Sequence, residues 1–218
     1  MQESGFLGIW SDIASETETN YLHWLTREHT SERLGVDGFM AVRVFRAHRT
    51  DVCRYFILYD LTSSAVLGSA PYLARLNSPT PWTRRIMPLI RNFVRGGGTI
   101  MASAGVGQGG TVMPLPLESG ETGDAAAILP DLVQVDRISA ARLYRTDHAG
   151  TSITTSEKSM REGDRTFESL LLIEGLDEPS VRSAHDRLHR RDPALRISTV
   201  RPVDTFAQVF ALRRDGHT

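Results

Sequence analysis

The sequence predicts an α+β fold made of two tandem β-α-β-β-α-β units whose antiparallel sheets pack face to face as a barrel. The first observation is a repeat: Val36–Ala47 (VDGFMAVRVFRA) recurs 99 residues later as Val135–Thr146 (VDRISAARLYRT). Val, Asp, Ala, Arg, an aromatic residue and Arg keep their register. The second is a fainter echo of Ile57–Leu61 in Leu172–Leu176. A repeat of about a hundred residues has the length of one small domain.

The third observation is the apolar character of both faces of the expected strand Phe39–Ala47. Phe39 and Phe45 alternate onto one face, and Val42 and Val44 onto the other. An antiparallel sheet with one face in solvent would carry polar residues on that face. We therefore expect the face opposite the helices to be covered by the sheet of the other unit.

The elements of the first unit follow from local patterns. Apolar and β-branched runs predict strands at 6–13, 39–47, 55–59 and 99–102. The sequence Ser15–Glu18 (SETE) has the capping-box pattern and predicts a helix from Ser15 to Leu34. A second helix is expected at 70–76, before a proline-rich stretch. This β-α-β-β-α-β order is that of a ferredoxin-like unit.

The second unit repeats this order less regularly. Strands are expected at 111–117, 139–146, 167–173 and 206–213, and helices at 125–133 and 180–190. The polar stretch 147–165 is expected to be a long hairpin. The predicted domains are therefore 1–104, a first ferredoxin-like unit that carries the expected pocket, and 105–218, a second, degenerate ferredoxin-like unit.

Composition limits the possible partners. Among 218 residues, 25 Lys and Arg face 26 Asp and Glu, which leaves no positive field to hold nucleic acid or an anionic membrane. No apolar run approaches the roughly 20 residues that span a bilayer. Cys53 is the single cysteine and cannot form an internal disulfide, and the N-terminal residues lack the pattern of a secretion signal. We expect a cytoplasmic protein.

The segment that contains the first copy of the repeat resembles a known family. The runs Trp24–Arg33 (WLTREHTSER), Val36–Phe39 (VDGF) and Arg43–Arg46 (RVFR) are similar to the helix-one and strand-two signature of EthD-like proteins. These belong to the dimeric α+β barrel superfamily; Asp37 stands where the family usually has proline. The resemblance implies a small-molecule cavity between sheet and helices. Members include cofactor-free monooxygenases, isomerases and cyclases, so it implies no single reaction.

His29 and Arg33 are the candidate catalytic residues. At 100° per residue they share an arc of about 80° with Leu22 and Leu25, on the helix face that should meet the sheet. A histidine there could transfer a proton in a dry pocket, and Arg33 could hold a carboxylate or enolate. In the alternative, His29 is a hydrogen-bonded core histidine and Arg33 bends outward to the helix C-terminus.

The repeat offers an internal comparison for this pair. The offset of 99 places Ile128 and Leu132 at the positions of His29 and Arg33, so a site would lie in the first unit. The other residues expected to line this substrate pocket are Asp12, Tyr21, Tyr59 and Trp82.

Three further patterns indicate structure rather than a site. Gly105–Gly110 fits G-x-G-x-x-G, but the prolines that follow cannot open a helix, so it is interpreted as a linker. His185 and His189 stand four residues apart without an evident third ligand, and we predict no metal site and no cofactor. Arg43 and Arg142 occur in both repeats, which favours a structural salt bridge in the barrel.

The sequence thus predicts a small-molecule enzyme of catabolism or secondary metabolism. Its expected reaction is cofactor-free proton transfer or oxygenation of a small aromatic or carbonyl compound. The alternative is a non-catalytic ligand-binding or assembly protein of the same fold. The expected partner is a small hydrophobic or aromatic molecule, with no nucleic acid and no membrane. A homodimer is also expected, although fusion of two units in one chain removes the need for it.

Overall fold

The computed structural model of the chain describes residues 4–48, 52–120, 122–151, 153–161 and 163–214. Within them, antiparallel strands close into one barrel in the order β1-β3-β2-β8-β5-β7-β6-β4. The strands are β1 (Gly5–Ile13), β2 (Phe39–Ala47), β3 (Cys53–Leu61), β4 (Arg91–Gly105), β5 (Thr111–Leu117), β6 (Ile138–Thr146), β7 (Ser169–Gly175) and β8 (Phe206–Arg213). The helices are α1 (Glu18–Trp24), α2 (Thr30–Leu34), α3 (Ala70–Asn77), α4 (Pro81–Ile86), α5 (Thr122–Leu132), α6 (His148–Thr151) and α7 (Glu178–Arg191).

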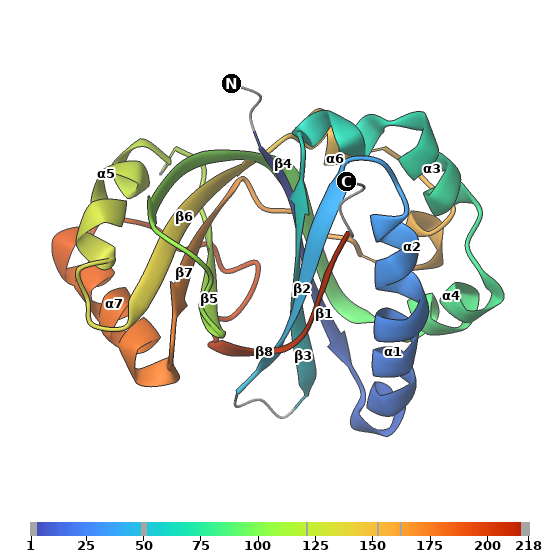
Figure 1. The fold of residues 1–218 in the computed structure, drawn as a ribbon, viewed down its shortest axis with the longest axis horizontal. Helices are drawn as coiled ribbons and strands as arrows, with labels where there is room; N and C mark the ends of the chain where they lie inside the picture. Colours follow the sequence, from blue (N-terminus) through green and yellow to red (C-terminus); the bar gives the residue numbers. More distant parts are fainter. Residues whose placement is uncertain (1–3, 49–51, 121, 152, 162, 215–218) are drawn as a thin grey trace.

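The barrel consists of two quartets with the same strand order. One is β4-β1-β3-β2 and the other is β8-β5-β7-β6, and they join where β2 pairs with β8 and β4 pairs with β6. The helices α1 to α4 cover the outside of the first quartet, and α5 and α7 cover the second (Figure 1). This confirms the predicted fold class of two ferredoxin-like units that form one barrel. The division into 1–104 and 105–218 stays a prediction, and its boundary falls at the last residues of β4.

The two copies of the repeated sequence occupy equivalent places. Each leads through a tight turn into a strand, β2 in one copy and β6 in the other. Gly38 and Arg137, which are 99 residues apart, both have positive φ, at 95° and 64°. A non-glycine residue rarely adopts this conformation, so the second turn keeps the backbone of the first despite the arginine.

Several local expectations were wrong. Ser15 does not cap the first helix but lies in a 3-10 turn, and the Glu18 carboxylate accepts hydrogen bonds from Arg46 Nε at 2.7 Å and from the Tyr55 hydroxyl at 2.5 Å. A β-bulge between Phe39 and Ala41 shifts the pairing of β2. Because a shift of one residue reverses the faces, Phe39 packs under the helices although Phe45 lies inside the barrel.

The last strand of the first unit starts earlier than predicted. β4 begins at Arg91 and includes Gly96, Gly97 and Gly98, which we had placed before the strand. The glycines are needed for close packing: a Cβ on Gly96 would lie 2.5 Å from the ring of Phe167, and one on Gly98 would collide with the Arg145 carbonyl. The three glycines therefore leave room beside β4 for the side chains and backbone that pack closely against it.

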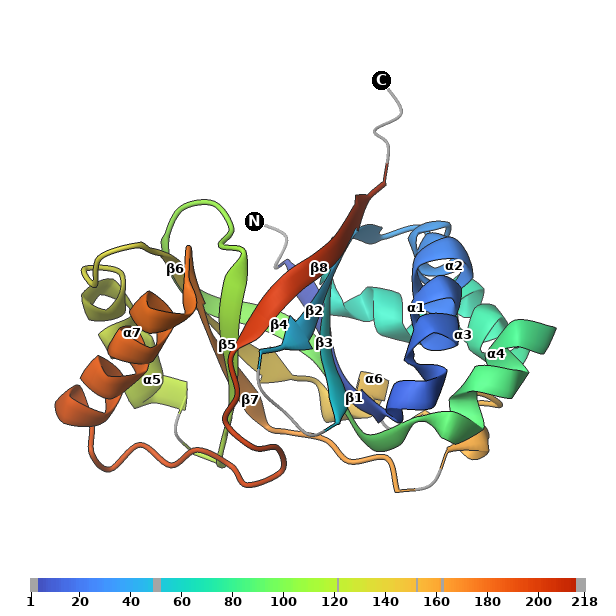
Figure 2. The ribbon, with the colours of Figure 1, turned by 90° about the horizontal axis from the view of Figure 1, so that it is seen from below.

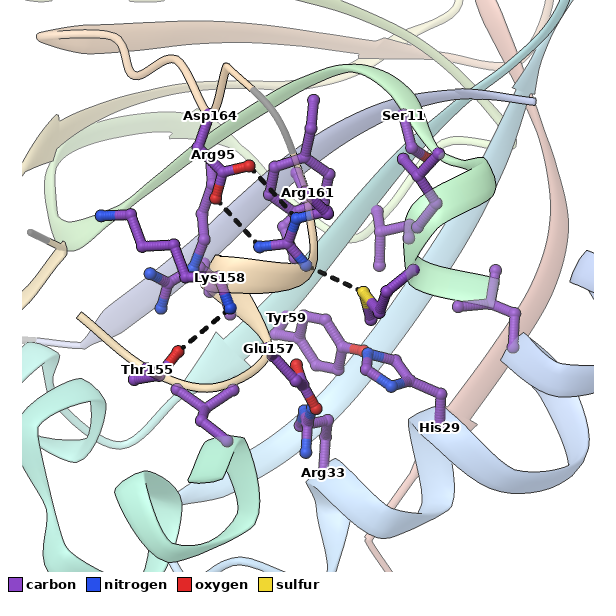
Figure 3. A pocket seen from close by; sticks show the side chains of 18 of the residues that line it. Ser11, His29, Arg33, Tyr59, Arg95, Thr155, Glu157, Lys158, Arg161 and Asp164 are labelled. Carbon is purple, nitrogen blue, oxygen red and sulfur yellow. Dashed lines mark hydrogen bonds and ion pairs between the residues drawn. The ribbon is translucent and has the colours of Figure 1, made fainter. Parts of the chain in front are cut away.

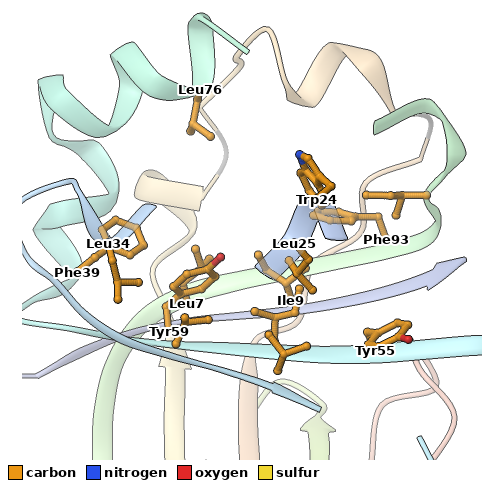
Figure 4. Close-up of a cluster of buried hydrophobic side chains, with 14 of the residues drawn as sticks. Leu7, Ile9, Trp24, Leu25, Leu34, Phe39, Tyr55, Tyr59, Leu76 and Phe93 are labelled. Carbon is orange, nitrogen blue, oxygen red and sulfur yellow. The ribbon is translucent and has the colours of Figure 1, made fainter. Parts of the chain in front are cut away.

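Apolar side chains form three buried clusters. One lies between the first quartet and α1 to α4 (Figure 4), and a second lies between the second quartet and helices α5 and α7. The third fills the barrel with aromatic rings, namely Phe6, Trp10, Phe45, Phe56, Tyr144, Phe167 and Phe206. The interior is thus covered on both sides of each sheet, as the two-sided apolar strands predict.

The arginines shared by both repeats meet inside the barrel. Arg43 donates to both oxygens of Glu174, at 2.6 and 3.3 Å, and Arg142 donates to the same carboxylate. Glu174 is fully buried and also accepts the amide of Gly109 at 3.3 Å. These contacts agree with the structural role expected for the two arginines, because one carboxylate from the second quartet ties the strands β2 and β6 together.

Candidate functional site

The candidate site is a cavity of about 50 Å³ between the first quartet and its helices. Most of its wall comes from strands β1, β3 and β4, from the helical residues 18–34 and from α3. The remaining wall is formed by residues of 153–161 and by Asp164, which belong to the second half of the chain. The polar residues among those that line the cavity are Ser11, Tyr21, His29, Arg33, Tyr59, Tyr72, Arg95, Thr155, Glu157, Lys158, Arg161 and Asp164.

A π-helical turn positions His29. The turn covers Leu25–His29 and separates α1 from α2, where a continuous α-helix was expected. The Thr26 hydroxyl donates to the Leu22 carbonyl oxygen at 2.7 Å and so takes an acceptor that a regular helix would use for an amide. Tyr21, Trp24 and His29 line the same cavity across this turn. Single π turns occur frequently at functional sites.

The imidazole of His29 is buried and makes no hydrogen bond to the residues that the structure describes. The residue is 7% exposed, its ring lies 4.2 Å from the indole of Trp24 between centroids, and Nδ1 has no partner among the described residues. Burial lowers the pKa of His29 well below its usual 6.5, and the positive charges of Arg33 and Arg161 lower it further. His29 is therefore neutral at neutral pH and retains a free lone pair.

Tyr59 presents a second unpartnered polar atom to the cavity. It comes from β3, its ring packs edge-on against Phe39 with centroids 5.5 Å apart, and its hydroxyl is buried without a hydrogen-bond partner among the described residues. Burial raises the pKa of Tyr59, so the hydroxyl stays protonated and can donate. By contrast, the hydroxyl of Tyr21 is hydrogen-bonded to that of Ser11 at 2.8 Å. Figure 3 shows Tyr59 and His29 both directed into the cavity.

Arg33 forms a buried ion pair with Glu157. The two residues are 2% and 4% exposed, and Arg33 Nη2 donates to Glu157 Oε1. Arg33 Nη1 makes no hydrogen bond to the described residues and lies 3.9 Å from Glu32 Oε2. Burial alone would lower the pKa of Arg33, but the attraction of Glu157 outweighs it and raises the pKa. Arg33 is thus a fixed cation on the cavity wall rather than a helix cap that points outward.

The segment that carries Glu157 crosses from the second half of the chain to the first. It leaves β6 through α6 and passes under the helices of the first quartet before it returns to β7 (Figure 2). The Glu157 amide donates to the Leu76 carbonyl at 3.0 Å, at the end of α3. Arg161 lies over the ring of Phe93 at 3.8 Å and donates to Asp164 at 2.9 and 3.1 Å. The expected hairpin at 147–165 is therefore a cavity wall.

Two residues expected in the pocket do not line it. Because side chains alternate along β1, Ser11 faces the cavity and Asp12 faces the barrel. There Asp12 accepts hydrogen bonds from Arg54 at 3.0 Å and from Arg201 at 2.5 Å. Trp82 is half-buried on α4, and its indole nitrogen donates to Asn20 at 3.1 Å, outside the cavity. The helix turns Thr83 and Ile86 inward instead.

The counterparts of the site residues in the second half are part of its core. Ile128 and Leu132 are buried in the apolar cluster beneath α5 and α7.

His185 and His189 face each other with 3.2 Å between their Nε2 atoms. Among the described residues, no three or more His, Cys, Asp or Glu side chains are grouped to hold a metal ion. No helix in the described parts of the chain is long and apolar enough to cross a membrane.

The arrangement can move a proton next to a fixed positive charge. A neutral imidazole can accept a proton, a tyrosine hydroxyl can donate a hydrogen bond, and a buried guanidinium can hold an anionic oxygen. Sequence reasoning identified His29, Arg33, Tyr21 and Tyr59 but missed Glu157 and Arg161. In the sequence, the stretch 147–165 around these two residues shows only low hydrophobicity, which indicated an exposed hairpin.

Comparison with known proteins places the fold. No family model and no curated protein matches the sequence. The structure is similar to the crystal structure of an anthrone oxidase-like protein, with a TM-score of 0.66, 10% identity, and coverage of 100% of this chain and 96% of that one.

Two more solved structures are similar over nearly their whole length. A candidate monooxygenase from Fusobacterium nucleatum gives a TM-score of 0.59 at 12% identity, with coverage of 99% and 97% of the two chains. A candidate chlorite dismutase gives 0.55 at 12% identity, with 96% of each chain covered. Similarity at this identity concerns the fold alone, which is that of a dimeric α+β barrel.

Proposed function

We propose that the chain is an enzyme that transfers a proton from, or oxygenates, a small aromatic or carbonyl compound without a cofactor, in the cavity of the first unit. One observation carries the proposal: His29 Nδ1 and the Tyr59 hydroxyl are buried polar atoms without partners among the described residues, and both residues line one cavity. Buried polar groups nearly always have a partner. Two unpartnered groups at one cavity therefore favour a bound molecule that supplies the missing hydrogen bonds.

In this proposal His29 is the general base. A C–H group next to a carbonyl gives its proton to the neutral imidazole, and the electron pair of the C–H bond moves onto the carbonyl oxygen as an enolate. His29 becomes an imidazolium. The negative charge of the enolate offsets the burial and the positive charges that lower the pKa of His29, so the base becomes stronger as charge develops.

Tyr59 is the proposed hydrogen-bond partner of the developing oxyanion, and Arg33 is the positive charge nearby. The protonated Tyr59 hydroxyl can donate a hydrogen bond, and Arg33 supplies a positive charge on the same cavity wall. Both groups are buried, so their interaction with a negative oxygen is stronger than it would be in water. Proton removal precedes either outcome, isomerisation of the enolate or its reaction with dioxygen.

Substrate entry requires a movement of the wall. The cavity of about 50 Å³ has room for a few water molecules and is smaller than the roughly 150 Å³ apolar cavity that accepts benzene. The strands and helices of the wall are part of the core, whereas the segment 153–161 has only a short 3-10 turn and lies outside the sheet. We propose that this segment moves to admit the substrate.

Two similarities support oxidative chemistry on such compounds. The solved structures of similar fold include proteins named as anthrone oxidase-like and as a candidate monooxygenase. The runs around His29 and Val36 resemble EthD-like proteins, and we propose that the chain is a distant member of that group. Anthrones and smaller 1,3-dicarbonyl compounds are therefore the first compounds to assay.

The test compares wild type with His29→Ala. Proton transfer is monitored as the exchange of the substrate's acidic C–H for deuterium in heavy water. Oxygenation is monitored as the uptake of dioxygen. We expect His29→Ala to lose at least about a hundredfold in rate, the contribution typical of a general base. His23→Ala is the matched control, since His23 lies on the same helix but does not line the cavity, and it should retain wild-type rates.

Stability separates this role from that of a structural histidine. His29 makes no hydrogen bond within the described residues, so its truncation leaves no partner unsatisfied and should change the free energy of unfolding by no more than about 2 kcal/mol. Wild type that binds these compounds but neither exchanges a proton nor takes up dioxygen would favour the alternative, a non-catalytic binding protein. A His29→Ala variant as active as wild type would refute the assignment of the base.

A further inference from the structure

We infer that the ligand of the cavity carries a carboxylate, and that this carboxylate replaces that of Glu157 on Arg33. The inference names the substrate class of the proposed active site and rests on that proposal for the identity of the cavity. Its physical content is separate, because it concerns which anion neutralises Arg33 and not which group moves a proton.

The buried guanidinium of Arg33 needs an anion beside it whether or not the segment 153–161 covers the cavity. The guanidinium is buried on α2, with the residue 2% exposed. A buried charge without a counter-ion is strongly unfavourable. When the segment 153–161 moves to admit a ligand, Glu157 moves with it, and Glu32, 3.9 Å from Nη1, is the carboxylate that stays beside the guanidinium. A ligand with a negative charge of its own would restore the lost ion pair.

Glu157 is held in a way that allows such an exchange. It engages one nitrogen of Arg33, and Nη1 has no hydrogen-bond partner in the part of the chain that the structure describes. Glu174 shows the contrasting arrangement, because it lies within strand β7 and accepts from both terminal nitrogens of Arg43. Guanidinium and carboxylate groups match best as two parallel hydrogen bonds. A free carboxylate could therefore use both nitrogens of Arg33, which Glu157 does not.

The remaining wall fits a small organic anion. Its charged residues are the four cations Arg33, Arg95, Lys158 and Arg161 and the two carboxylates Glu157 and Asp164. Glu157, Lys158 and Arg161 lie in the segment that moves, whereas the cations Arg33 and Arg95 and the carboxylate of Asp164 lie outside it. The apolar part of the wall includes Trp24 and Phe93, which suit an aromatic or alkyl body. The expected class is a small aromatic or alkyl carboxylate, and removal of the Glu157 side chain also vacates space for it.

The test measures binding of benzoate by calorimetry, with benzamide and benzyl alcohol as uncharged probes of similar shape. Wild type should bind benzoate at least about tenfold more tightly than either uncharged probe, the factor expected when a charged hydrogen-bonded partner is lost. Glu157→Gln removes the competing charge and should tighten benzoate binding about tenfold, with little effect on benzamide. Glu32→Gln is the matched control, since it removes a carboxylate 3.9 Å from the same guanidinium but outside the cavity wall. It should change the affinity less than about threefold.

A double variant keeps the test decisive if single changes impair folding. Arg33→Met with Glu157→Met removes both charges together, leaves neither unpaired, and should abolish the preference for benzoate. Equal affinity of wild type for benzoate and benzamide would overturn the inference, as would unchanged benzoate affinity in Glu157→Gln.

The proposed enzyme activity fails or stands on a different measurement. Wild type that prefers benzoate but turns over no carbonyl compound, with or without a carboxylate group, would leave the carboxylate site in place and refute the enzyme. Turnover of an uncharged carbonyl compound that benzoate fails to inhibit would refute the carboxylate site and leave the enzyme.

Discussion

Arg33 and Glu157 form a buried ion pair although 124 residues separate them in the chain. Arg33 lies on the helix that covers the first quartet, and Glu157 lies in the connection between two strands of the second quartet, β6 and β7. The pair therefore fastens a segment of the second half of the chain over the cavity of the first half. Its energetics should be visible both in ligand binding and in stability.

Removal of one member of this pair should destabilise the protein more than removal of both. Arg33→Met or Glu157→Met should each lower the free energy of unfolding by about 3 to 5 kcal/mol, because each leaves a buried charge unpaired. The double variant should lose clearly less than the sum of the two. Urea denaturation of the four proteins measures the coupling. Arg196→Met, at the exposed pair with Glu118, is the control and should change the free energy by less than about 1 kcal/mol. Additive losses would contradict the finding.

Stability should fall in mildly acidic solution because of His29. Its folded pKa is lowered, so between that value and its usual 6.5 the unfolded chain binds a proton that the folded protein does not. The contribution of neutral His29 to the free energy of unfolding is fully present above pH 6.5. It is lost as the pH falls below this value, by up to about 1.4 kcal/mol per pH unit. Urea titrations from pH 7.5 to 5 measure it. The slope of the unfolding free energy against pH should be shallower for His29→Gln, by the equivalent of up to one proton taken up on unfolding. This difference separates the effect of His29 from that of His185, whose pKa is also lowered. Equal slopes would contradict it.

Glu174 should be essential for the barrel. Its fully buried carboxylate accepts from Arg43 and Arg142, so Glu174→Gln deprives both guanidinium groups of the carboxylate that they share. We expect a loss of about 3 to 5 kcal/mol in the free energy of unfolding. Glu168→Gln changes an exposed carboxylate paired with His148 and should alter stability by less than about 1 kcal/mol. Thermal and urea unfolding compare the two, and similar effects would argue against a structural role for the shared arginines.

The glycines of β4 should tolerate no side chain. In Gly98→Ala the new Cβ would collide with the carbonyl of Arg145, a backbone atom that cannot rotate away. We expect a loss of about 3 kcal/mol or more in unfolding free energy. Gly68→Ala is the control, because a Cβ there meets no atom within 4 Å and the change should be near neutral. Melting temperatures of the two variants test the difference, and an unaffected Gly98→Ala would mean that β4 can shift within the barrel.

The sequence by itself determined the features that depend on local periodicity and on repetition. The bounds of β2, β5 and β8 agree with the prediction, because alternation and flanking turn residues act within a few residues of the backbone. The repeat predicted the shared strand order and brought Arg43 and Arg142 to related places. The helical period placed His29 and Arg33 on one inward face, and both line the cavity.

Only the tertiary structure decided what those side chains meet. The partner of Arg33 comes from a polar stretch with no periodic pattern, and its position over the cavity follows from how the barrel closes. A bulge beside Met40 and a π turn before Thr30 each shift the register by about one residue. Asp12 faces the barrel because its neighbour Ser11 faces the cavity. Such choices depend on contacts between residues far apart in the chain, which no local pattern records.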